Sequence, residues 1–287
     1  MAKVAIVGAG VIGIGWARLF ARGGWDVALA DPRPDLEQIV ADDLSGLPVT
    51  AHAEAGSAAE GVDYVQEAGP ERLEFKHEVF AELAAATADD VVLASSSSSL
   101  LPTDIAQGSS VAGRILIGHP FNPADLMPLV EVVPGAKTAD AAVDRAMTVY
   151  RELGKTPIRL QREIPGFVGN RLQKVFNDQA IYLVQQGIIA AEDLDDLVKA
   201  SLGLRWATVG PFEGMNLGGG PAGIRHLMDN VGSQMTFDIG SPDKSAMGMV
   251  VQQVDAAYGN GEQQYEQGVT ARDEKTRAIL HALGEGA

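Results

Sequence analysis

Cysteine is absent from this sequence of 287 residues, and basic side chains are scarce. The absence of cysteine excludes disulfide bonds, thiolate metal ligands and a cysteine nucleophile. Only 22 Lys and Arg residues stand against 38 Asp and Glu residues, which gives a formal net charge of −16. Because such a negative field repels a phosphate polymer, we expect no nucleic-acid partner. We also predict no metal site.

Long apolar runs are missing as well. The hydrophobic stretch at 1–20 is interrupted by glycines and has no small-residue cleavage pattern behind it. We therefore expect neither a signal peptide nor a membrane-spanning segment. Hydrophobic residues still make up 46% of the chain and charged residues 21%, which is enough for a packed core. We expect a cytoplasmic protein with no membrane partner.

The first half of the sequence alternates short β-rich apolar runs with helical segments. We predict strands at 3–7, 26–30, 62–66, 91–94, 114–117, 129–133 and 157–160, and helices at 12–22, 72–87 and 139–153. Strands that alternate with helices are typical of a parallel sheet covered on both faces. The sequence therefore predicts an α/β fold with a doubly wound sheet in its N-terminal part.

The second half has a different pattern, with apolar residues at helical spacing from 166 to 202. Pro165 precedes this stretch, and proline is tolerated at the start of a helix. Residues 201–220 are predicted to be loop-rich, and the remainder is mostly helical, ending in a helix at 271–283. We therefore predict two domains, 1–163 and 164–287, of which the second is mainly α-helical.

A glycine-rich turn, GAGVIG at 8–13, links the first predicted strand to the first predicted helix. Glycines at this spacing allow a tight turn and the close approach of a pyrophosphate, which the helix N-terminus attracts. Asp31 ends the second strand, where its carboxylate would bind ribose hydroxyls and repel a 2′-phosphate, although Arg33 could soften that repulsion. The pattern indicates a Rossmann-type domain that binds NAD. A turn that binds FAD, or no ligand, is the alternative. The predicted cofactor-binding residues here are Gly8, Gly10, Val11, Ile12, Gly13 and Asp31.

One histidine has a readable partner. His119 ends one predicted strand and Glu131 lies on the next, so a hairpin between these strands would place the two side chains together. A neighbouring glutamate fixes the tautomer of a histidine and raises its pKa. Such a pair can take the proton of a hydroxyl while a hydride leaves for a nicotinamide. A purely structural contact between His119 and Glu131 is the alternative.

Several stretches of the sequence together resemble the 3-hydroxyacyl-CoA dehydrogenase superfamily. They are GAGVIG at 8–13, PERLEFK at 70–76, ASSSSSLLPTDIA at 94–106, GHPFNP at 118–123, LVEVVPG at 129–135 and IPGFVGNRL at 164–172. They occur in the order of the family and span most of the chain. The resemblance implies that domain 1–163 binds NAD, and that the helical domain 164–287 binds substrate and forms a homodimer.

The resemblance also implies roles for individual residues. His119 is similar to the general acid/base of the family, and Glu131 to the carboxylate that orients it. Ser98 and Asn170 match the residues that hold the substrate oxygen, although the run of serines at 95–99 leaves the register of Ser98 open by one. Asn122 matches a residue that supports the local hydrogen bonds. Glu71 and Lys76 match residues near the nicotinamide half of NAD. For this last pair, an ion pair on a helix surface is the alternative.

Two stretches depart from the acyl-CoA enzymes. The segment 32–66 is short and contains no Lys or Arg after Arg33, whereas a CoA tail needs cations for its phosphates. The segment 202–232 contains Arg205 and Trp206 and is more similar to the branch of lambda-crystallin/L-gulonate 3-dehydrogenase and L-carnitine dehydrogenase. We expect Arg205 to bind a substrate carboxylate, the alternative being an arginine that bridges domains or subunits. Trp206 is a candidate for a quaternary ammonium group, or else a packing residue.

These observations predict an NAD-dependent dehydrogenase that oxidises the 3-hydroxyl of a small free hydroxy acid, either gulonate-like or carnitine-like. The alternative within the enzymes is a 3-hydroxyacyl-CoA dehydrogenase acting on a short-chain CoA thioester. The alternative outside them is an NAD-binding structural protein of the crystallin kind. The predicted catalytic residues are His119, Glu131, Ser98 and Asn170. The predicted substrate-binding residues are Ser98, Asn122, Asn170, Arg205 and Trp206.

Overall fold

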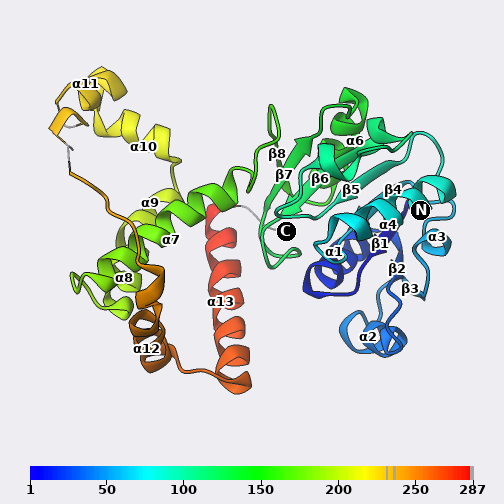
Figure 1. Cartoon of the computed structure of the whole chain (residues 1–287), viewed down its shortest axis with the longest axis horizontal. Coiled ribbons are helices and arrows are strands. Elements are labelled where there is room, and N and C mark those ends of the chain that lie inside the picture. The colour runs from blue at the N-terminus through cyan, green and yellow to red at the C-terminus, as the bar shows by residue number, and fades with distance from the viewer. Residues whose placement is uncertain (231, 235–236, 285–287) are drawn as a thin grey trace. The chain divides into compact units, whose positions relative to one another are not determined.

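A computed structural model describes residues 1–230, 232–234 and 237–284 of the chain. The remaining residues, 231, 235–236 and 285–287, fall within the predicted C-terminal domain and lie outside the described part. The chain divides into two compact units, the first built on Met1–Arg171 and the second comprising Leu172–Leu283. Figure 1 shows the first unit in blue to green and the helices of the second in green to red.

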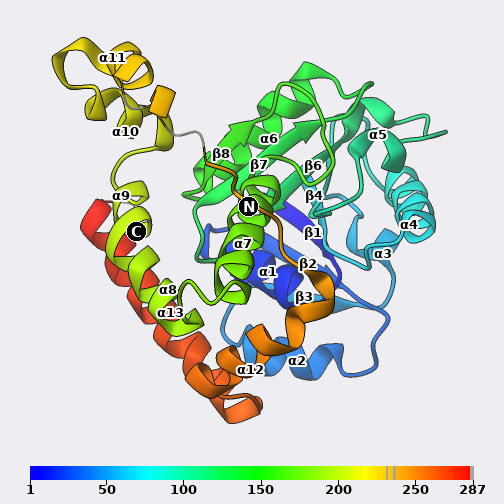
Figure 2. The ribbon, with the colours of Figure 1, turned by 60° about the vertical axis from the view of Figure 1, so that its left-hand side comes forward.

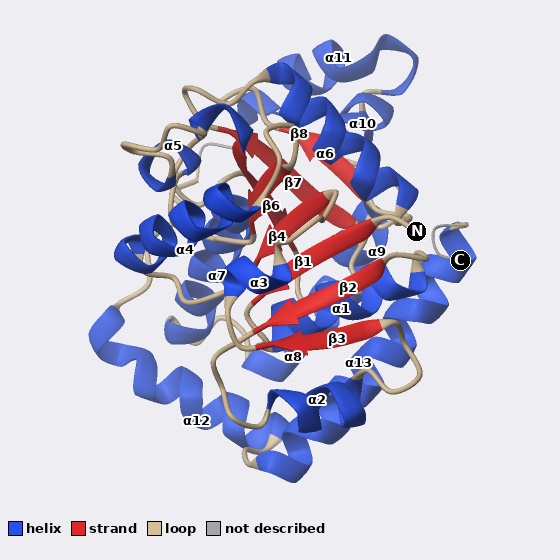
Figure 3. Cartoon of the chain, turned by 90° about the vertical axis from the view of Figure 1, so that its right-hand side faces the viewer, coloured by secondary structure: helices blue, strands red, loops and turns tan. Residues whose placement is uncertain are grey.

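The first unit contains one sheet of eight strands in the order β3-β2-β1-β4-β5-β6-β7-β8. Figure 3 shows this sheet with β3 at one edge and β8 at the other. All neighbouring strands are parallel except β6 and β7, which are antiparallel. Because β1 lies between β2 and β4, the strand order reverses beside β1, which is where doubly wound sheets bind dinucleotides. The strands are β1 Lys3–Val7, β2 Asp26–Ala30, β3 Val49–His52, β4 Tyr64–Glu67, β5 Val92–Ser95, β6 Ile115–Pro120, β7 Leu129–Pro134 and β8 Thr156–Arg159.

Helices cover both faces of this sheet, because alternate strand residues point to opposite sides. In β1, Val4 and Ile6 join a core with α1 (Val11–Arg22) and α6 (Asp140–Glu152). The alternate residues of β1 join a second core with α3 (Ala55–Ala58), α4 (Leu73–Ala86) and α5 (Pro102–Ile105). The prediction of an N-terminal Rossmann-type doubly wound sheet is therefore confirmed.

Three elements between β2 and β4 were not predicted from the sequence. These are α2 (Leu36–Asp43), β3 and α3. Strand β3 has only four residues, VTAH, and its place in the sheet comes from parallel pairing with β2. A run this short carries too little periodicity to predict a strand, so only the contact with β2 identifies it.

The second unit is helical, which confirms the predicted mainly helical C-terminal part. Its helices are α7 Gly169–Gln185 (which begins in the first unit), α8 Ala191–Val198, α9 Leu204–Trp206, α10 Pro211–Gly218, α11 Gly223–Asn230, α12 Met247–Tyr258 and α13 Glu262–Leu283. The prediction that 201–220 is loop-rich was wrong, because α10 forms there with Pro211 at its start, a position that proline suits. The helical stretch predicted for 166–202 is interrupted at Gly187, whose φ of +68° is left-handed.

Few side chains of the second unit are buried. Its hydrophobic cluster of buried residues consists of Val184, Leu194 and Val250. Helix α13, the long helix in Figure 2, has 22 residues and no buried side chain. Within the described residues, no helix combines the length and apolar character needed to cross a membrane.

Candidate active site

The glycine turn has the geometry of a phosphate cradle. Gly8 follows β1 with a φ of +102°, a conformation that favours glycine, and α1 begins at Val11. A Cβ on Gly13 would overlap the carbonyl oxygen of Gly8, whereas one on Gly10 would meet no atom within 4 Å. Gly10 is the N-cap of α1, so the open space beside it lies at a helix N-terminus, whose free N–H groups bind a pyrophosphate favourably.

Asp31 lies beside this turn, directly after β2. One carboxylate oxygen accepts a hydrogen bond from the N–H of Ala9 (2.8 Å) and the other from the N–H of Arg33 (3.0 Å). The guanidinium of Arg33 forms two hydrogen bonds to Asp35, of 2.6 and 2.8 Å, so its charge is engaged there. A cavity of about 420 Å³ opens between Gly8, Asp31 and Phe75. The residues present fit the adenosine half of a dinucleotide.

A buried ion pair follows β4 on the other side of β1. The ammonium of Lys76 lies 2.7 and 2.8 Å from the two carboxylate oxygens of Glu67, and Ser95 donates a hydrogen bond of 2.6 Å to the same carboxylate. Burial raises the pKa of Glu67, and the nearby ammonium and hydrogen bonds offset only part of that effect. Lys76 is therefore a buried partner of Glu67, which the sequence analysis did not single out. Its contact with Glu71, at 3.9 Å, is longer.

Glu71 organises the serine run. Its Oε1 accepts hydrogen bonds from the hydroxyl of Ser97 (2.6 Å), the N–H of Ser98 (3.0 Å), and the N–H and hydroxyl of Ser99 (both 2.8 Å). Burial raises the pKa of Glu71, but the hydrogen bonds from Ser97 and Ser99 outweigh it, so the pKa lies below its ordinary value. The hydroxyls of Ser97 and Ser99 are thereby occupied. That of Ser98 is exposed and has no hydrogen bond within the described part of the chain.

His119 and Glu131 face each other across the antiparallel pair β6–β7, where they are direct register partners. The Nδ1 atom of His119 lies 2.9 Å from Oε2 of Glu131, and the two residues are 6% and 2% exposed. The other carboxylate oxygen accepts hydrogen bonds from the N–H groups of Val168 (2.9 Å) and Gly169 (3.0 Å) at the start of α7. Burial raises the pKa of Glu131, but the hydrogen bonds from His119, Gly169 and Val168 outweigh it and lower the pKa overall.

This arrangement fixes the chemistry of the imidazole. A carboxylate only accepts hydrogen bonds, so the proton of neutral His119 lies on Nδ1 and its Nε2 is left as a base. The rings of Phe121 and Phe167 stand 5.9 and 5.4 Å from the imidazole, centroid to centroid. Phe167 has a φ of +48°, unusual for a residue with a side chain, in the turn that leads into α7. The backbone of this turn presents the two N–H groups to Glu131.

The other predicted site residues are divided between the two units: Asn170 and Asn122 lie in the first, and Arg205 and Trp206 in the second. Asn170, in the first turn of α7, donates a long hydrogen bond (3.4 Å) to the carbonyl oxygen of Ser98, which links the serine run to the His119–Glu131 pair. Asn122 is exposed just after β6. Arg205 and Trp206 lie on α9 in the second unit. There the ring of Trp206, 47% exposed, stands edge-on to Phe176 with centroids 6.2 Å apart.

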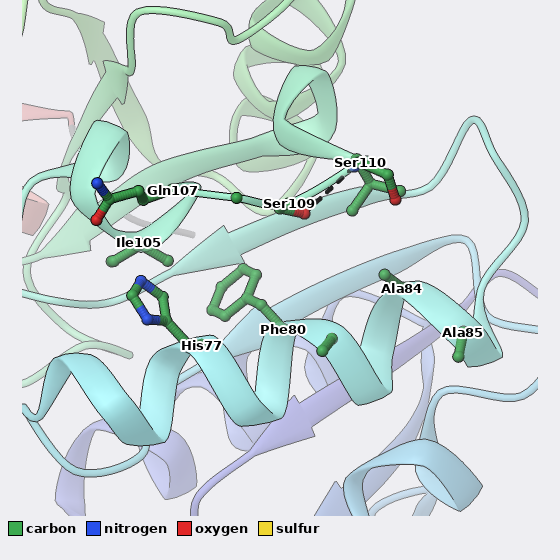
Figure 4. A pocket seen from close by; sticks show the side chains of 11 residues that line it. His77, Phe80, Ala84, Ala85, Ile105, Gln107, Ser109 and Ser110 are labelled. Atoms are coloured by element: carbon green, nitrogen blue, oxygen red, sulfur yellow. Dashed lines mark hydrogen bonds between the residues drawn. The ribbon is translucent and has the colours of Figure 1, made fainter.

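A separate pocket of about 420 Å³ lies between α4 and residues 105–111. Figure 4 shows His77 and Phe80 reaching from α4 toward Ile105, with Gln107 and Ser109 on the opposite wall. No Lys, Arg, Asp or Glu is among its lining residues, so the pocket has no permanently charged side chain to pair with a phosphate or a carboxylate. The glycine turn and the residues that follow β4, β5 and β6 therefore remain the candidate active site.

Two family models match the chain. The NAD binding domain of 3-hydroxyacyl-CoA dehydrogenase matches residues 3–46 and 37–164, and the C-terminal domain of 3-hydroxyacyl-CoA dehydrogenase matches residues 166–266. Together they cover the regions that carry the glycine turn, the His119–Glu131 pair and most of the helical unit. The predicted resemblance and the predicted cofactor NAD are both confirmed by these matches.

Individual dehydrogenases are also similar to this chain. An L-carnitine dehydrogenase of Streptomyces griseus is 40% identical over 82% of this chain and 75% of its own length. A 3-hydroxyacyl-CoA dehydrogenase of Gibberella moniliformis is 44% identical over 80% of this chain and 77% of its own. The structure of 5-formyl-3-hydroxy-2-methylpyridine 4-carboxylic acid 5-dehydrogenase, described as an NAD+-dependent dismutase, covers all of both chains with a TM-score of 0.82 and 25% identity.

Proposed function

The chain belongs to the 3-hydroxyacyl-CoA dehydrogenase family, and from that premise we propose that it oxidises the 3-hydroxyl of a small, free, carnitine-like hydroxy acid to the 3-keto acid with NAD. The observation that carries this proposal is the imidazole of His119, whose Nδ1 faces the carboxylate of Glu131 at 2.9 Å while its Nε2 is left as a base. NAD, when bound over the glycine turn, would supply the hydride acceptor.

The chain's own residues manage the proton and the oxygen. Nε2 of His119 takes the proton of the substrate hydroxyl, and the carboxylate of Glu131 stabilises the imidazolium that forms. The side chains of Ser98 and Asn170 hold the substrate oxygen in line. They are suited to this because the carbonyl oxygen of Ser98 is bonded to Asn170, while the Ser98 hydroxyl has no partner among the described residues. Asn122, Glu71 and Lys76 shape the surrounding site.

The choice of a free acid over a CoA ester is supported by charge. The segment between Asp31 and Glu67 contributes no Lys or Arg after Arg33, and the guanidinium of Arg33 is already paired with Asp35. A CoA tail would find few cations there for its phosphates. We propose that Arg205 binds the substrate carboxylate through two parallel hydrogen bonds, and that the face of Trp206 binds a quaternary ammonium group.

The test of the proposed substrate is a comparison of catalytic efficiency. We would follow NAD reduction at a pH of about 9, where proton release favours alcohol oxidation, with L-carnitine, L-gulonate, 3-hydroxybutyrate and the CoA ester of 3-hydroxybutyrate. The proposal expects kcat/KM to be highest for L-carnitine. A higher kcat/KM for the CoA ester would replace it with the acyl-CoA alternative. NADH binding without turnover of any substrate would favour a structural protein.

A separate variant tests the proposed role of Arg205. Arg205→Met removes the guanidinium from α9 and should raise the KM for an acid substrate by about 10- to 100-fold, while the Kd for NADH stays the same. Arg225→Met, which removes an arginine from α11, serves as the matched control and should leave KM unchanged. Equal KM values in the Arg205→Met variant and the wild type would exclude the carboxylate role.

We also propose that the protein works as a homodimer joined through its helical unit. The support is apolar surface: α13 buries no side chain, and Tyr265, Ile279 and Leu283 on it are 69%, 52% and 40% exposed. Exposed apolar surface on this scale is typical of an interface. Light scattering should give twice the chain mass of 30.1 kDa, and Ile279→Asp should shift it toward the monomer. A monomeric wild-type protein would refute the proposal.

These assignments suggest a separate role for each of the two domains. We propose that residues 1–163 form the NAD-binding domain, that 164–287 form the substrate and dimerisation domain, and that the protein acts in the cytoplasm. Limited proteolysis near Pro165 tests the boundary, because a linker is cut before packed helices are. Cell fractionation tests the location.

A further inference from the structure

A chain of buried polar side chains runs beneath the carboxyl edge of the sheet. The hydroxyl of Tyr150 on α6 lies 2.6 Å from Oε1 of Gln66 on β4, and Nε2 of Gln66 lies 2.7 Å from Oγ of Ser96. The indole Nε1 of Trp16 on α1 lies 3.0 Å from the same Ser96 oxygen. Trp16, Gln66 and Tyr150 are all fully buried. Two of these side chains, Trp16 and Gln66, therefore contact Ser96 directly, and Tyr150 joins the chain through Gln66.

The direction of every hydrogen bond in this chain is fixed. Nε2 of Gln66 also lies 3.3 Å from the carbonyl oxygen of Gly118, which can only accept, so this end of the Gln66 amide is the donor end. Its Oε1 must then accept the proton of Tyr150. The indole N–H of Trp16 is a donor only. Both Gln66 and Trp16 therefore donate to Ser96.

Ser96 is left with a proton to give. A hydroxyl has two acceptor sites and one donor, and both acceptor sites of Ser96 are filled by Trp16 and Gln66. Within the described part of the chain, no atom accepts a hydrogen bond from the Ser96 hydroxyl. The residue is half-buried and directly follows β5. Its O–H is held as a donor by its neighbours and is available to a ligand.

The position of Ser96 identifies that ligand. In the sheet order, β4 and β5 lie on one side of β1, while β2 and Asp31 lie on the other. A dinucleotide that crosses the sheet at β1 places its adenosine near Asp31 and its second nucleoside over the ends of β4 and β5. We propose that Ser96 donates a hydrogen bond to an oxygen of the nicotinamide nucleoside. This inference rests on the proposed function only through NAD binding, and it adds a cofactor-binding residue.

Calorimetry with two ligands tests the proposal. NADH occupies both halves of the site, whereas ADP occupies only the adenosine half. The ratio of the Kd for NADH to the Kd for ADP therefore isolates the contribution of the nicotinamide half. Ser96→Ala should raise this ratio about 3- to 10-fold, the effect of one lost hydrogen bond. Trp16→Phe is the matched control, since it removes a donor to Ser96 but keeps the hydroxyl, and it should leave the ratio unchanged.

Two results would overturn the proposal. One is an unchanged ratio in Ser96→Ala, and the other is an equal rise in Ser96→Ala and Trp16→Phe, which would mean that Ser96 acts only through packing. If Ser96→Ala does not fold, Ser96→Cys keeps the volume with a weaker donor and should raise the ratio in the same direction. Because no substrate is used, a failed turnover assay leaves this test intact. If the wild type binds no NADH, the proposed function fails as well.

Discussion

Replacing Glu131 by Gln changes the side-chain volume very little, but it moves the proton of the His119 imidazole from Nδ1 to Nε2. The Oε1 position must keep an oxygen, because it accepts hydrogen bonds from the N–H groups of Val168 (2.9 Å) and Gly169 (3.0 Å). The amide nitrogen of the glutamine is then forced to face Nδ1 of His119, 2.9 Å away in the wild type. Since the amide nitrogen donates, the imidazole must move its proton to Nε2.

The expected loss follows from this change of tautomer. An imidazole protonated on Nε2 cannot accept the substrate proton, and general-base catalysis contributes about 10²- to 10⁴-fold, so we expect kcat to fall by that factor. The Kd for NADH should stay the same, because Glu131 contacts His119 and α7 and not the glycine turn. Steady-state NAD reduction with L-carnitine measures kcat, and calorimetry measures the Kd.

Two controls sharpen this test. His119→Ala removes the base itself, so the double variant of His119→Ala and Glu131→Gln should be no slower than His119→Ala alone, because both act on one step. Turnover of Glu131→Gln close to the wild-type value would refute the tautomer argument. A large rise in the Kd for NADH would show instead that the change had disturbed the fold.

Three further predictions concern the cofactor site and the turn after His119. Asp31→Ser removes a negative charge from the ribose site and should improve NADP+ binding about 10-fold relative to NAD+, measured by calorimetry; an unchanged preference would contradict it. Gly13→Ala places a Cβ on the carbonyl oxygen of Gly8 and should abolish NADH binding, whereas retained binding would show that the turn can shift. Lys155 is buried against the carbonyl oxygens of Ala124 (2.5 Å) and Met127 (2.8 Å), and burial lowers its pKa from 10.5 to about 8. At pH values between about 8 and 10.5, the unfolded chain binds more protons at this lysine than the folded chain does. The free energy of unfolding should therefore rise with pH by up to about 3 kcal/mol relative to that of Lys155→Met. Urea unfolding measures both, and an equal pH dependence in the wild type and in Lys155→Met would refute this.

The pairing of His119 with Glu131 could be predicted because its information is local. His119 and Glu131 lie on consecutive strands, and an antiparallel hairpin makes them neighbours whatever the rest of the fold does. The glycine turn is local in the same sense, since strand, turn and helix follow one another directly. The position of Asp31 beside the turn could be predicted from only one further strand, the one that Asp31 follows.

Other parts of the site depend on contacts between distant segments. Glu67 ends β4 like many strand-terminal acids, and only the return of α4 shows that Lys76 is its partner. Ser96 looks like any member of a serine run until α1 and β4 bring Trp16 and Gln66 to its oxygen. Such roles depend on tertiary structure and leave no periodic signal in the sequence.

The error over 201–220 has a different physical cause. That stretch is rich in glycine and reads as a loop, yet α10 forms from Pro211 to Gly218. A proline at the start and glycines at the end suit the two termini of a helix and do not oppose it. Composition alone therefore hid the boundaries of a short helix.

A crystal structure with NAD+ and a slowly oxidised carnitine analogue measures the central claim most directly. The account predicts Nε2 of His119 within about 2.6–3.2 Å of the C3 hydroxyl oxygen, with the C3 hydrogen directed at the nicotinamide ring and Glu131 still bonded to Nδ1. A complex in which the imidazole faces away from that hydroxyl, with the nicotinamide bound over the ends of β4 and β5, would contradict it.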